Sequence, residues 1–181
     1  MSAYNSPIFL VPKKGEDEKF RLVVDFRALN EKIVSDKFPL PRIDDILQSL
    51  GKARYLSSCD VASAFHQVGI RPDVRHLTAF SFPEFGQYEF KRLPYGIKIA
   101  PNSFSRMISI ALSGLENRAF FYIDDIVIFS SSIQHHITNL QLVFDRLRKF
   151  SLKLNPSKCN FLRKEIHYLG HKVTDKGVYP D

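Results

Sequence analysis

The sequence is poor in sulfur and contains no tryptophan: its 181 residues include two methionines and two cysteines. Cys59 and Cys159 are far apart and lack a Cys-x-x-Cys spacing, so the sequence predicts no disulfide framework and a reducing intracellular setting. No apolar run reaches transmembrane length, because Asp124 and Asp125 interrupt the longest one. The first residues also lack the basic and long apolar regions of a signal peptide. We therefore expect a cytoplasmic protein with no membrane partner.

Signatures of several common enzyme classes are missing as well. There is no Gly-x-x-x-x-Gly-Lys-Ser/Thr loop, which excludes a P-loop nucleotidase, and no Asp-Thr-Gly or Asp-Ser-Gly protease signature. His167 and His171, with Cys159 upstream, suggest a zinc site only loosely. Gly170 and the strand-like surroundings would hold the two imidazoles too far apart, so we expect no zinc ion there.

Charge and composition indicate a folded protein with an anionic partner. The sequence has 26 Lys and Arg against 19 Asp and Glu, a net charge of +7 and a pI near 9.4. An excess of this sign attracts polyanions, most simply nucleic acid or nucleotides. Apolar residues make up 44% of the chain and aromatic residues 13%, so we expect one domain, or one domain with two lobes.

The segment from Ala119 to Phe129 contains the clearest chemical signal. Two apolar runs, 119–123 and 126–129, predict a β-hairpin with Asp124 and Asp125 at its tight turn. Adjacent carboxylates near an apolar sheet repel each other and lose hydration, and a hard divalent cation removes both costs. The pair is therefore predicted to bind metal; the alternative is an exposed acidic turn without a ligand.

The remaining pattern predicts an α+β protein. Helices are expected from Pro41 to Gly51, from Pro101 to about Leu115, and after a cap at Ser131 or Ser132, and strands at 8–12, 20–26, 55–61, 77–82 and 87–93. The apolar face of the third helix is predicted to contain Ile133, Ile137, Leu140, Phe144 and Leu147. A second acidic pair, Asp44–Asp45, falls in the first turn of a helix, where carboxylates complement the helix dipole and need no metal.

Asp60 is a third candidate ligand, because it ends the apolar strand that begins at Tyr55. If that strand lies beside the acidic hairpin, three carboxylates converge. Such a set holds two Mg²⁺ ions about 3.5–4 Å apart in phosphoryl-transfer enzymes, with Mn²⁺ as an alternative metal.

These residues belong to a longer series of segments that resembles the fingers and palm of a reverse transcriptase. The series is most similar to the gypsy-type class of long-terminal-repeat retroelements and covers essentially the whole chain. The matching segments, in the family's order, are Ser6-Pro7, Lys13-Lys14-Gly15, Arg21-Leu-Val-Val-Asp-Phe-Arg-Ala-Leu-Asn30, Phe38-Pro-Leu-Pro-Arg-Ile-Asp44, Asp60-Val-Ala-Ser-Ala-Phe-His-Gln67, Thr78-Ala-Phe80, Leu93-Pro-Tyr-Gly-Ile-Lys-Ile-Ala-Pro101, Tyr122-Ile-Asp-Asp125, Leu154 to Cys159, and Tyr168-Leu-Gly-His171.

The resemblance implies an RNA-directed DNA polymerase, a nucleotidyltransferase from a retrotransposon polyprotein. It implies a right-hand α+β fold in which helices back an antiparallel palm sheet, with fingers at about 1–35 and 68–99 and palm at about 36–67 and 100–181. The first finger segment and the thumb, connection and ribonuclease H regions are expected to be absent. The expected location is the cytoplasm or a virus-like particle, and the oligomeric state is left open.

The resemblance also assigns the chemistry. The primer 3′-hydroxyl attacks the α-phosphate of an incoming dNTP and pyrophosphate leaves, with one metal activating the hydroxyl and the other neutralising the triphosphate. Asp60, Asp124, Asp125 and the backbone carbonyl of Val61 would hold the metals. Lys158 lies near the position expected to protonate the leaving group.

Further residues are expected to contact substrates. Lys14 and Arg21 would grip the β and γ phosphates, and the backbone amides of Ser63 and Ala64 would meet the triphosphate. Phe65 would lie under the sugar and exclude a 2′-hydroxyl. The residues that match template or primer contacts, on an RNA or DNA template, are Arg27, Tyr122, Tyr168, Leu169 and Gly170.

The nucleotide-facing block departs from the family's usual pattern at two positions. Tyr95 stands where this class usually has Phe, and Ile99 where it usually has Asn. The first change is mild. The second removes a polar group, so a hydrogen bond expected at that position is in doubt.

Two other functions remain open at this point. One is a nucleic-acid-binding remnant that keeps its acids but has lost catalysis. The other is an RNA-templated RNA polymerase with a similar palm, against which Phe65 argues.

Overall fold

The computed structural model describes residues 2–12, 19–51 and 53–181. The chain forms two compact units: the first contains Met1–Lys37 and Phe65–Ser103, and the second contains Phe38–Ala64 and Phe104–Asp181. Along the chain, the final passage from the first unit to the second falls between Ser103 and Phe104, within helix α3 (Ala100–Ala111). The predicted fingers and palm boundaries lie within a few residues of the unit boundaries, and the assignment of the units to fingers and palm stays a prediction.

A four-stranded antiparallel sheet with the order β6-β7-β3-β8 forms the centre of the second unit. Its strands are β6 (Ala119–Tyr122), β7 (Asp125–Ser130), β3 (Tyr55–Asp60) and β8 (Asn160–Arg163). The predicted hairpin is present, but its turn consists of Ile123 and Asp124, because Asp125 already pairs with Tyr122. Ile123 has a φ of 53°, which is costly for a β-branched residue. The strain therefore falls on Ile123 and not on the acidic pair.

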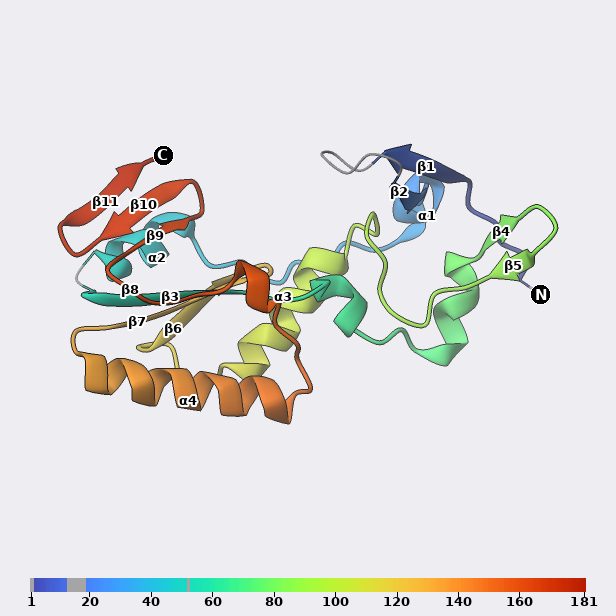
Figure 1. Cartoon of the computed structure of the whole chain (residues 1–181). Coiled ribbons are helices and arrows are strands. Elements are labelled where there is room, and N and C mark those ends of the chain that lie inside the picture. Colours follow the sequence, from blue (N-terminus) through green and yellow to red (C-terminus); the bar gives the residue numbers. More distant parts are fainter. Residues whose placement is uncertain (1, 13–18, 52) are drawn as a thin grey trace. The chain divides into compact units, whose positions relative to one another are not determined.

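One face of this sheet packs against helix α2 and a small antiparallel sheet (Figure 1). Helix α2 (Ile43–Leu50) starts two residues after Pro41 and has Asp44 and Asp45 in its first turn, as expected. The small sheet has the order β11-β10-β9, with β9 (Glu165–Tyr168), β10 (His171–Thr174) and β11 (Gly177–Pro180). Their shared core consists of Ile46, Leu47, Leu50, Ala53, Leu56, Val127, Ile166, Tyr168 and Val173.

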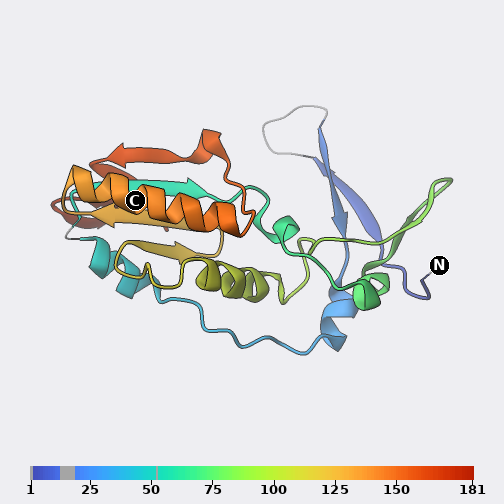
Figure 2. The ribbon, with the colours of Figure 1, turned by 90° about the horizontal axis from the view of Figure 1, so that it is seen from below.

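Helix α4 (Ile133–Lys149) covers the opposite face of the sheet (Figures 1 and 2). Ser132 caps it by accepting a hydrogen bond from the His135 amide, as predicted. The predicted apolar face is confirmed at Leu147, which is 2% exposed, but it is wrong at Ile133 and Ile137, which are 51% and 40% exposed. The other buried side chains, which were not predicted, are His136, Asn139 and Val143.

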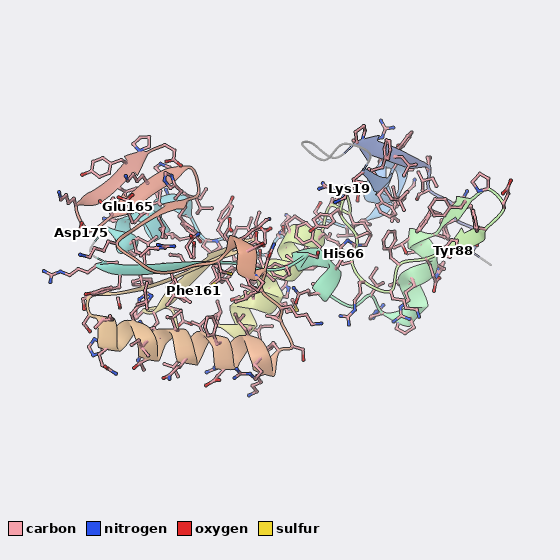
Figure 3. The ribbon with its side chains drawn as sticks, viewed as in Figure 1. Lys19, His66, Tyr88, Phe161, Glu165 and Asp175 are labelled. Carbon is pink, nitrogen blue, oxygen red and sulfur yellow. The ribbon has the colours of Figure 1, made fainter. Side chains whose placement is uncertain are left out.

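Hydrogen bonds explain why α4 turns a different face toward the sheet than its apolar residues predict. The ring of His136 bonds Ser57 Oγ at 2.7 Å and Ser130 Oγ at 3.0 Å, and Asn139 Nδ2 donates to the Phe129 carbonyl at 3.0 Å. Buried polar groups that find such partners can face a sheet, which a count of apolar residues does not register. Farther along the helix, Phe144 meets Phe161 of β8 edge-on at 5.9 Å (Figure 3 labels Phe161).

His136 makes stability depend on pH. Burial lowers its pKa below the ordinary 6.5, so the unfolded chain takes up a proton more readily than the folded protein. The free energy of unfolding is therefore expected to be highest above pH 6.5 and to fall as the pH drops through the interval between the two pKa values. Urea unfolding across this range should show a weaker pH dependence in His136→Gln than in His135→Gln, which changes the exposed neighbour. Equal pH dependence in the two variants would contradict the assignment.

The first unit consists of short elements around a separate core. They are β1 (Ile8–Pro12), β2 (Phe20–Val24), α1 (Arg27–Lys32), η1 (Ala64–Gln67), η2 (Pro72–Thr78), β4 (Phe80–Phe82) and β5 (Gly86–Tyr88). The first residue of η1, Ala64, still belongs to the second unit. The predicted strand 77–82 begins only at Phe80, because Pro72 opens a 3-10 helix that runs through Thr78. Helix α1 was not predicted. The core contains Val24, Phe26, Phe80, Leu93, Ile97 and Ala100.

None of the helices in the described ranges has the length and apolar character needed to cross a membrane.

Candidate active site

The three predicted carboxylates lie together at one end of the sheet in the second unit. Asp60 is the last residue of β3 and pairs directly with Asp125, the first residue of β7. Directly paired residues of antiparallel strands have Cα atoms about 4.5–5.5 Å apart. Asp124 precedes Asp125 in the turn, and its carbonyl accepts a hydrogen bond from the Val61 amide at 2.9 Å. The sequence predicted this convergence only by resemblance, and the strand register provides it.

Lys158 belongs to the same group. Its Nζ lies 3.2 Å from Asp60 Oδ2, and it comes from the 3-10 turn η3 (Pro156–Lys158). The Asn155 amide donates to the Asp60 carbonyl at 2.9 Å, which holds this turn against the end of β3. The hydrogen bond to Asp60, together with the charges of the acidic residues, raises the pKa of Lys158.

Negative charge exceeds positive charge in this group. Burial raises the pKa of Asp125, and the neighbouring charges of Asp124 and Asp60 raise it further, while Lys158 opposes them. A carboxyl whose ionised form is disfavoured in this way gains from a second cation. Oxygen donors of this kind suit a hard divalent ion.

The side chains are not yet arranged as a metal site. Within residues 2–12, 19–51 and 53–181, no three His, Cys, Asp or Glu side chains are gathered so that they could hold an ion. Lys158 is the cation that contacts Asp60 in this arrangement.

The turn between β9 and β10 borders the carboxylates. Tyr168 is 3% exposed, and its hydroxyl donates to the Asp125 carbonyl at 3.2 Å. Burial, and then the charge of Asp125, raise the pKa of this hydroxyl. Leu169 and Gly170 form the turn with φ of 51° and 73°, a pattern that suits a tight hairpin. A pocket of about 210 Å³ is lined by Ser58, Cys59, Asp60, Asp125, Lys158, Asn160, His167, Tyr168 and Leu169.

The residues after Asp60 form a sharp bend. Val61 is 1% exposed, Ser63 has a φ of 46° and Ala64 is 2% exposed. Non-glycine residues at positive φ are uncommon and mark positions that the surrounding fold constrains. Tyr122, at the other end of the acidic turn, pairs with Asp125 and packs against the core of the second unit.

The other predicted contacts belong to the first unit, and Lys14 lies outside the described residues. Arg21 is exposed on β2. Phe65 packs against the core of this unit, and its ring centroid is 5.1 Å from that of Tyr95, which is 54% exposed. Ile99 also packs against this core, so the departure from the family pattern places an apolar side chain in apolar surroundings.

Arg27 is paired with an acid in the same unit. Its Nη2 lies 2.6 Å from Asp25 Oδ2, and this hydrogen bond lowers the pKa of Asp25. The Arg27 side chain is nevertheless 88% exposed. It can therefore meet a partner while Asp25 fixes one edge of the guanidinium.

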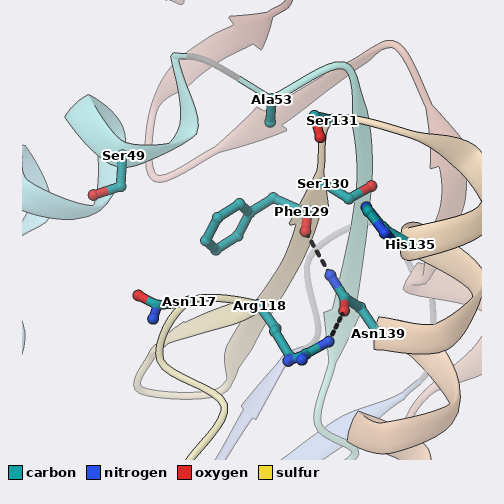
Figure 4. A pocket seen from close by; sticks show the side chains of 9 residues that line it. All are labelled: Ser49, Ala53, Asn117, Arg118, Phe129, Ser130, Ser131, His135 and Asn139. Atoms are coloured by element: carbon teal, nitrogen blue, oxygen red, sulfur yellow. Dashed lines mark hydrogen bonds between the residues drawn. The ribbon is translucent and has the colours of Figure 1, made fainter.

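A larger cavity, of about 450 Å³, lies at the other end of β7 (Figure 4). Arg118 donates to Asn139 Oδ1 at 2.8 Å in this cavity. Its lining residues are Ser49, Ala53, Asn117, Arg118, Phe129, Ser130, Ser131, His135 and Asn139. None of the predicted site residues is among them, so size alone does not locate the chemistry.

Sequence reasoning gave little weight to Lys158 and none to Ser58, Asn160 or His167 at this site. Ser58 and Asn160 are brought together by the pairing of β3 with β8, and His167 comes from β9. A sequence alone does not reveal such long-range register.

Comparison with known proteins supplies the family. The family described as reverse transcriptase (RNA-dependent DNA polymerase) matches residues 11–173. The chain is 51% identical to the retrovirus-related Pol polyprotein from transposon 412 of Drosophila melanogaster, over 100% of this chain and 15% of that protein. It is 36% identical to the corresponding polyprotein from transposon gypsy of the same organism, over 99% of this chain and 18% of that protein. The chain thus spans less than a fifth of these relatives.

Solved structures agree with the predicted fold. The foamy viral protease-reverse transcriptase in complex with RNA/DNA hybrid has a TM-score of 0.89 and 28% identity, over 99% of this chain and 24% of that chain. The same viral protein in complex with double-stranded DNA reaches a TM-score of 0.89 and 29% identity, over 100% of this chain and 37% of that chain. The α+β polymerase fold and the resemblance to gypsy-type elements are confirmed, while the boundaries between fingers and palm stay a prediction.

Proposed function

The chain belongs to the reverse transcriptase (RNA-dependent DNA polymerase) family, and we propose that it is the fingers and palm of a polymerase that extends a primer with dNTPs. The observation that carries the proposal is the direct pairing of Asp60 with Asp125 beside Asp124. Fingers would comprise about 1–35 and 68–99, and palm about 36–67 and 100–181. The proposed location, the cytoplasm or a virus-like particle, rests on the likeness to retrotransposon polyproteins.

The carboxylates would hold the divalent ions that polymerases use. Asp60, Asp124, Asp125 and the Val61 carbonyl are the proposed ligands of two Mg²⁺ ions, or of Mn²⁺. When bound, such ions lower the pKa of a hydroxyl and neutralise phosphate charge. The excess of negative charge around Asp125 supports this choice.

Protein groups around the acids would position the reactants. The Tyr168 hydroxyl and the Val61 amide bond the backbone carbonyls of Asp125 and Asp124, so both carboxylates project from a fixed backbone. Lys158, once released from Asp60, would be the donor of a proton to the leaving pyrophosphate.

The proposed nucleotide contacts follow from charge and shape. Lys14 and Arg21 would bind the β and γ phosphates, and the amides of Ser63 and Ala64 would meet the triphosphate. Phe65, supported by the Tyr95 ring, would lie under the sugar.

The proposed partner is an RNA or DNA template with its primer. The foamy viral relative in complex with RNA/DNA hybrid supports this proposal. Arg27 would contact the template, and Tyr122 and the turn at Tyr168, Leu169 and Gly170 would contact the primer. The +7 net charge favours a nucleic-acid partner as well.

Deoxynucleotide incorporation on an RNA template with a DNA primer tests the function. We expect extension in Mg²⁺ or Mn²⁺ and none in chelator. Salt-dependent duplex binding without extension in either metal would favour the alternative of a binding remnant.

Phe65→Ala tests the sugar contact. Removing the ring should open space for a 2′-hydroxyl and raise the efficiency of ribonucleotide incorporation relative to deoxynucleotides by at least about tenfold. Phe82→Ala, a partly buried ring of the same unit, serves as the matched control. Unchanged sugar selectivity in Phe65→Ala would remove this residue from the proposed site and reopen the RNA polymerase alternative.

A further inference from the structure

The two cysteines, which the sequence separates by a hundred positions, are neighbours in the folded chain. Ser58 of β3 stands opposite Asn160 of β8 in an antiparallel register. Continuing this register by one residue, beyond the first residue of β8, brings Cys159 next to Cys59. A further step places Asp60 opposite Lys158, and these two side chains do form an ion pair. The register is therefore supported on both sides of the cysteine pair.

The thiols also interact with each other. Burial and then the neighbouring Cys159 side chain raise the pKa of the Cys59 thiol, and Cys159 Sγ donates to the Asn155 carbonyl at 3.1 Å. Both cysteines are free. Opposed residues of paired strands have Cβ atoms about 4.5–5.5 Å apart, and a disulfide needs about 3.5–4.5 Å. Cys159 lies between η3 and β8, outside the regular strand, so closing the bond would require a local movement of this segment.

We infer that Cys59 and Cys159 form a redox-responsive pair, which a low-molecular-weight disulfide converts into an internal disulfide joining β3 to the segment before β8. Cys59 is 1% exposed and Cys159 is partly exposed, so the oxidant meets Cys159 first. The inference does not depend on the proposed polymerase activity.

The reaction balances as two thiol–disulfide exchanges. The Cys159 sulfur attacks one sulfur of the small disulfide, its S–S bond breaks, and one small thiol leaves with the Cys159 proton. The Cys59 sulfur then attacks the Cys159 sulfur and expels the second small thiol, which takes the Cys59 proton. The protein loses two hydrogens, and the small disulfide is reduced to two thiols.

The bond would lie on the face of β3 opposite to Asp60, because neighbouring residues of a strand point to opposite faces. Cys59 directly precedes Asp60 and Cys159 directly follows Lys158. The disulfide would therefore tie together the two segments that present this ion pair, next to the pocket that Cys59 helps to line.

Treatment of the folded chain with oxidised glutathione, followed by digestion without reductant and mass spectrometry, tests the inference. We expect a cross-linked peptide containing both cysteines, formed faster in buffer than in urea, where the register is lost. The thermal unfolding midpoint should rise by about 5 to 10 °C and return after dithiothreitol.

The single variants separate the steps. Cys59→Ser should stop at a stable glutathione adduct on Cys159, and Cys159→Ser should react slowly or not at all. A persistent adduct on Cys159 of the unaltered chain, no modification of either cysteine, or a cross-link that forms only in urea would each overturn the inference.

Discussion

Replacing Asp124 by Asn is expected to lower primer extension by at least about a thousandfold. The substitution preserves size and removes one of the three negative charges that meet at the end of β3 and β7. The hydrogen bond from Val61 goes to the backbone carbonyl of Asp124, so the turn keeps its main-chain support. Single-nucleotide incorporation with saturating dNTP measures the loss in kcat.

Asp44→Asn is the matched control, because Asp44 also belongs to an Asp-Asp pair but lies exposed in the first turn of α2. We expect its activity to stay close to that of the unaltered chain. Circular dichroism and duplex binding should be unchanged in both variants. Extension by Asp124→Asn at a rate similar to that of Asp44→Asn would remove Asp124 from the catalytic group.

Replacing Phe104 by Ala is expected to have the largest effect on stability, about 3–5 kcal/mol. Phe104 is the largest fully buried side chain, with 0% exposure. Its removal takes away apolar contacts and leaves a cavity that the surrounding close-packed groups fill only in part. Urea unfolding followed by far-ultraviolet circular dichroism measures the difference through the shift in midpoint.

Phe85→Ala removes a ring that is 74% exposed and serves as the control. Its cost is expected to stay within about 0.5 kcal/mol. A loss below about 1 kcal/mol in Phe104→Ala would mean that Phe104 is less tightly packed than the structure shows.

Local patterns predicted the elements that place the carboxylates. Apolar runs on both sides of Asp124 predicted the hairpin, and the apolar strand after Tyr55 predicted that Asp60 would stand at a strand end. These signals work because each depends on a few consecutive residues. The exact turn was missed, since the chain places positive φ on Ile123, where propensity argues against it.

Features that depend on distant partners were not predictable. The face of α4 was predicted only in part, because His136 and Asn139 are buried by hydrogen bonds to groups on the sheet. The cysteines gave no motif, and only the register of β3 with β8 makes them neighbours. Lys158 was expected near the acids by resemblance alone, and its contact with Asp60 depends on the packing of η3 against the end of β3. Sequence periodicity describes one helix or strand at a time, whereas these contacts depend on which two segments lie side by side in the fold.

Strand β3 is hydrogen-bonded on both sides, to β7 and to β8, and its last residue is Asp60. Side chains alternate between the two faces along a strand, so a gain or loss of one codon within 55–60 would turn every following side chain of the strand to the other face. The thiol of Cys59 and the carboxylate of Asp60 would exchange sides. A substitution of one base changes at most one side chain of this strand, whereas an in-frame gain or loss of one codon turns all the following side chains to the other face of the sheet. A lineage of such genes can therefore vary in length at its turns, but this stretch has to be inherited with its codon count unchanged.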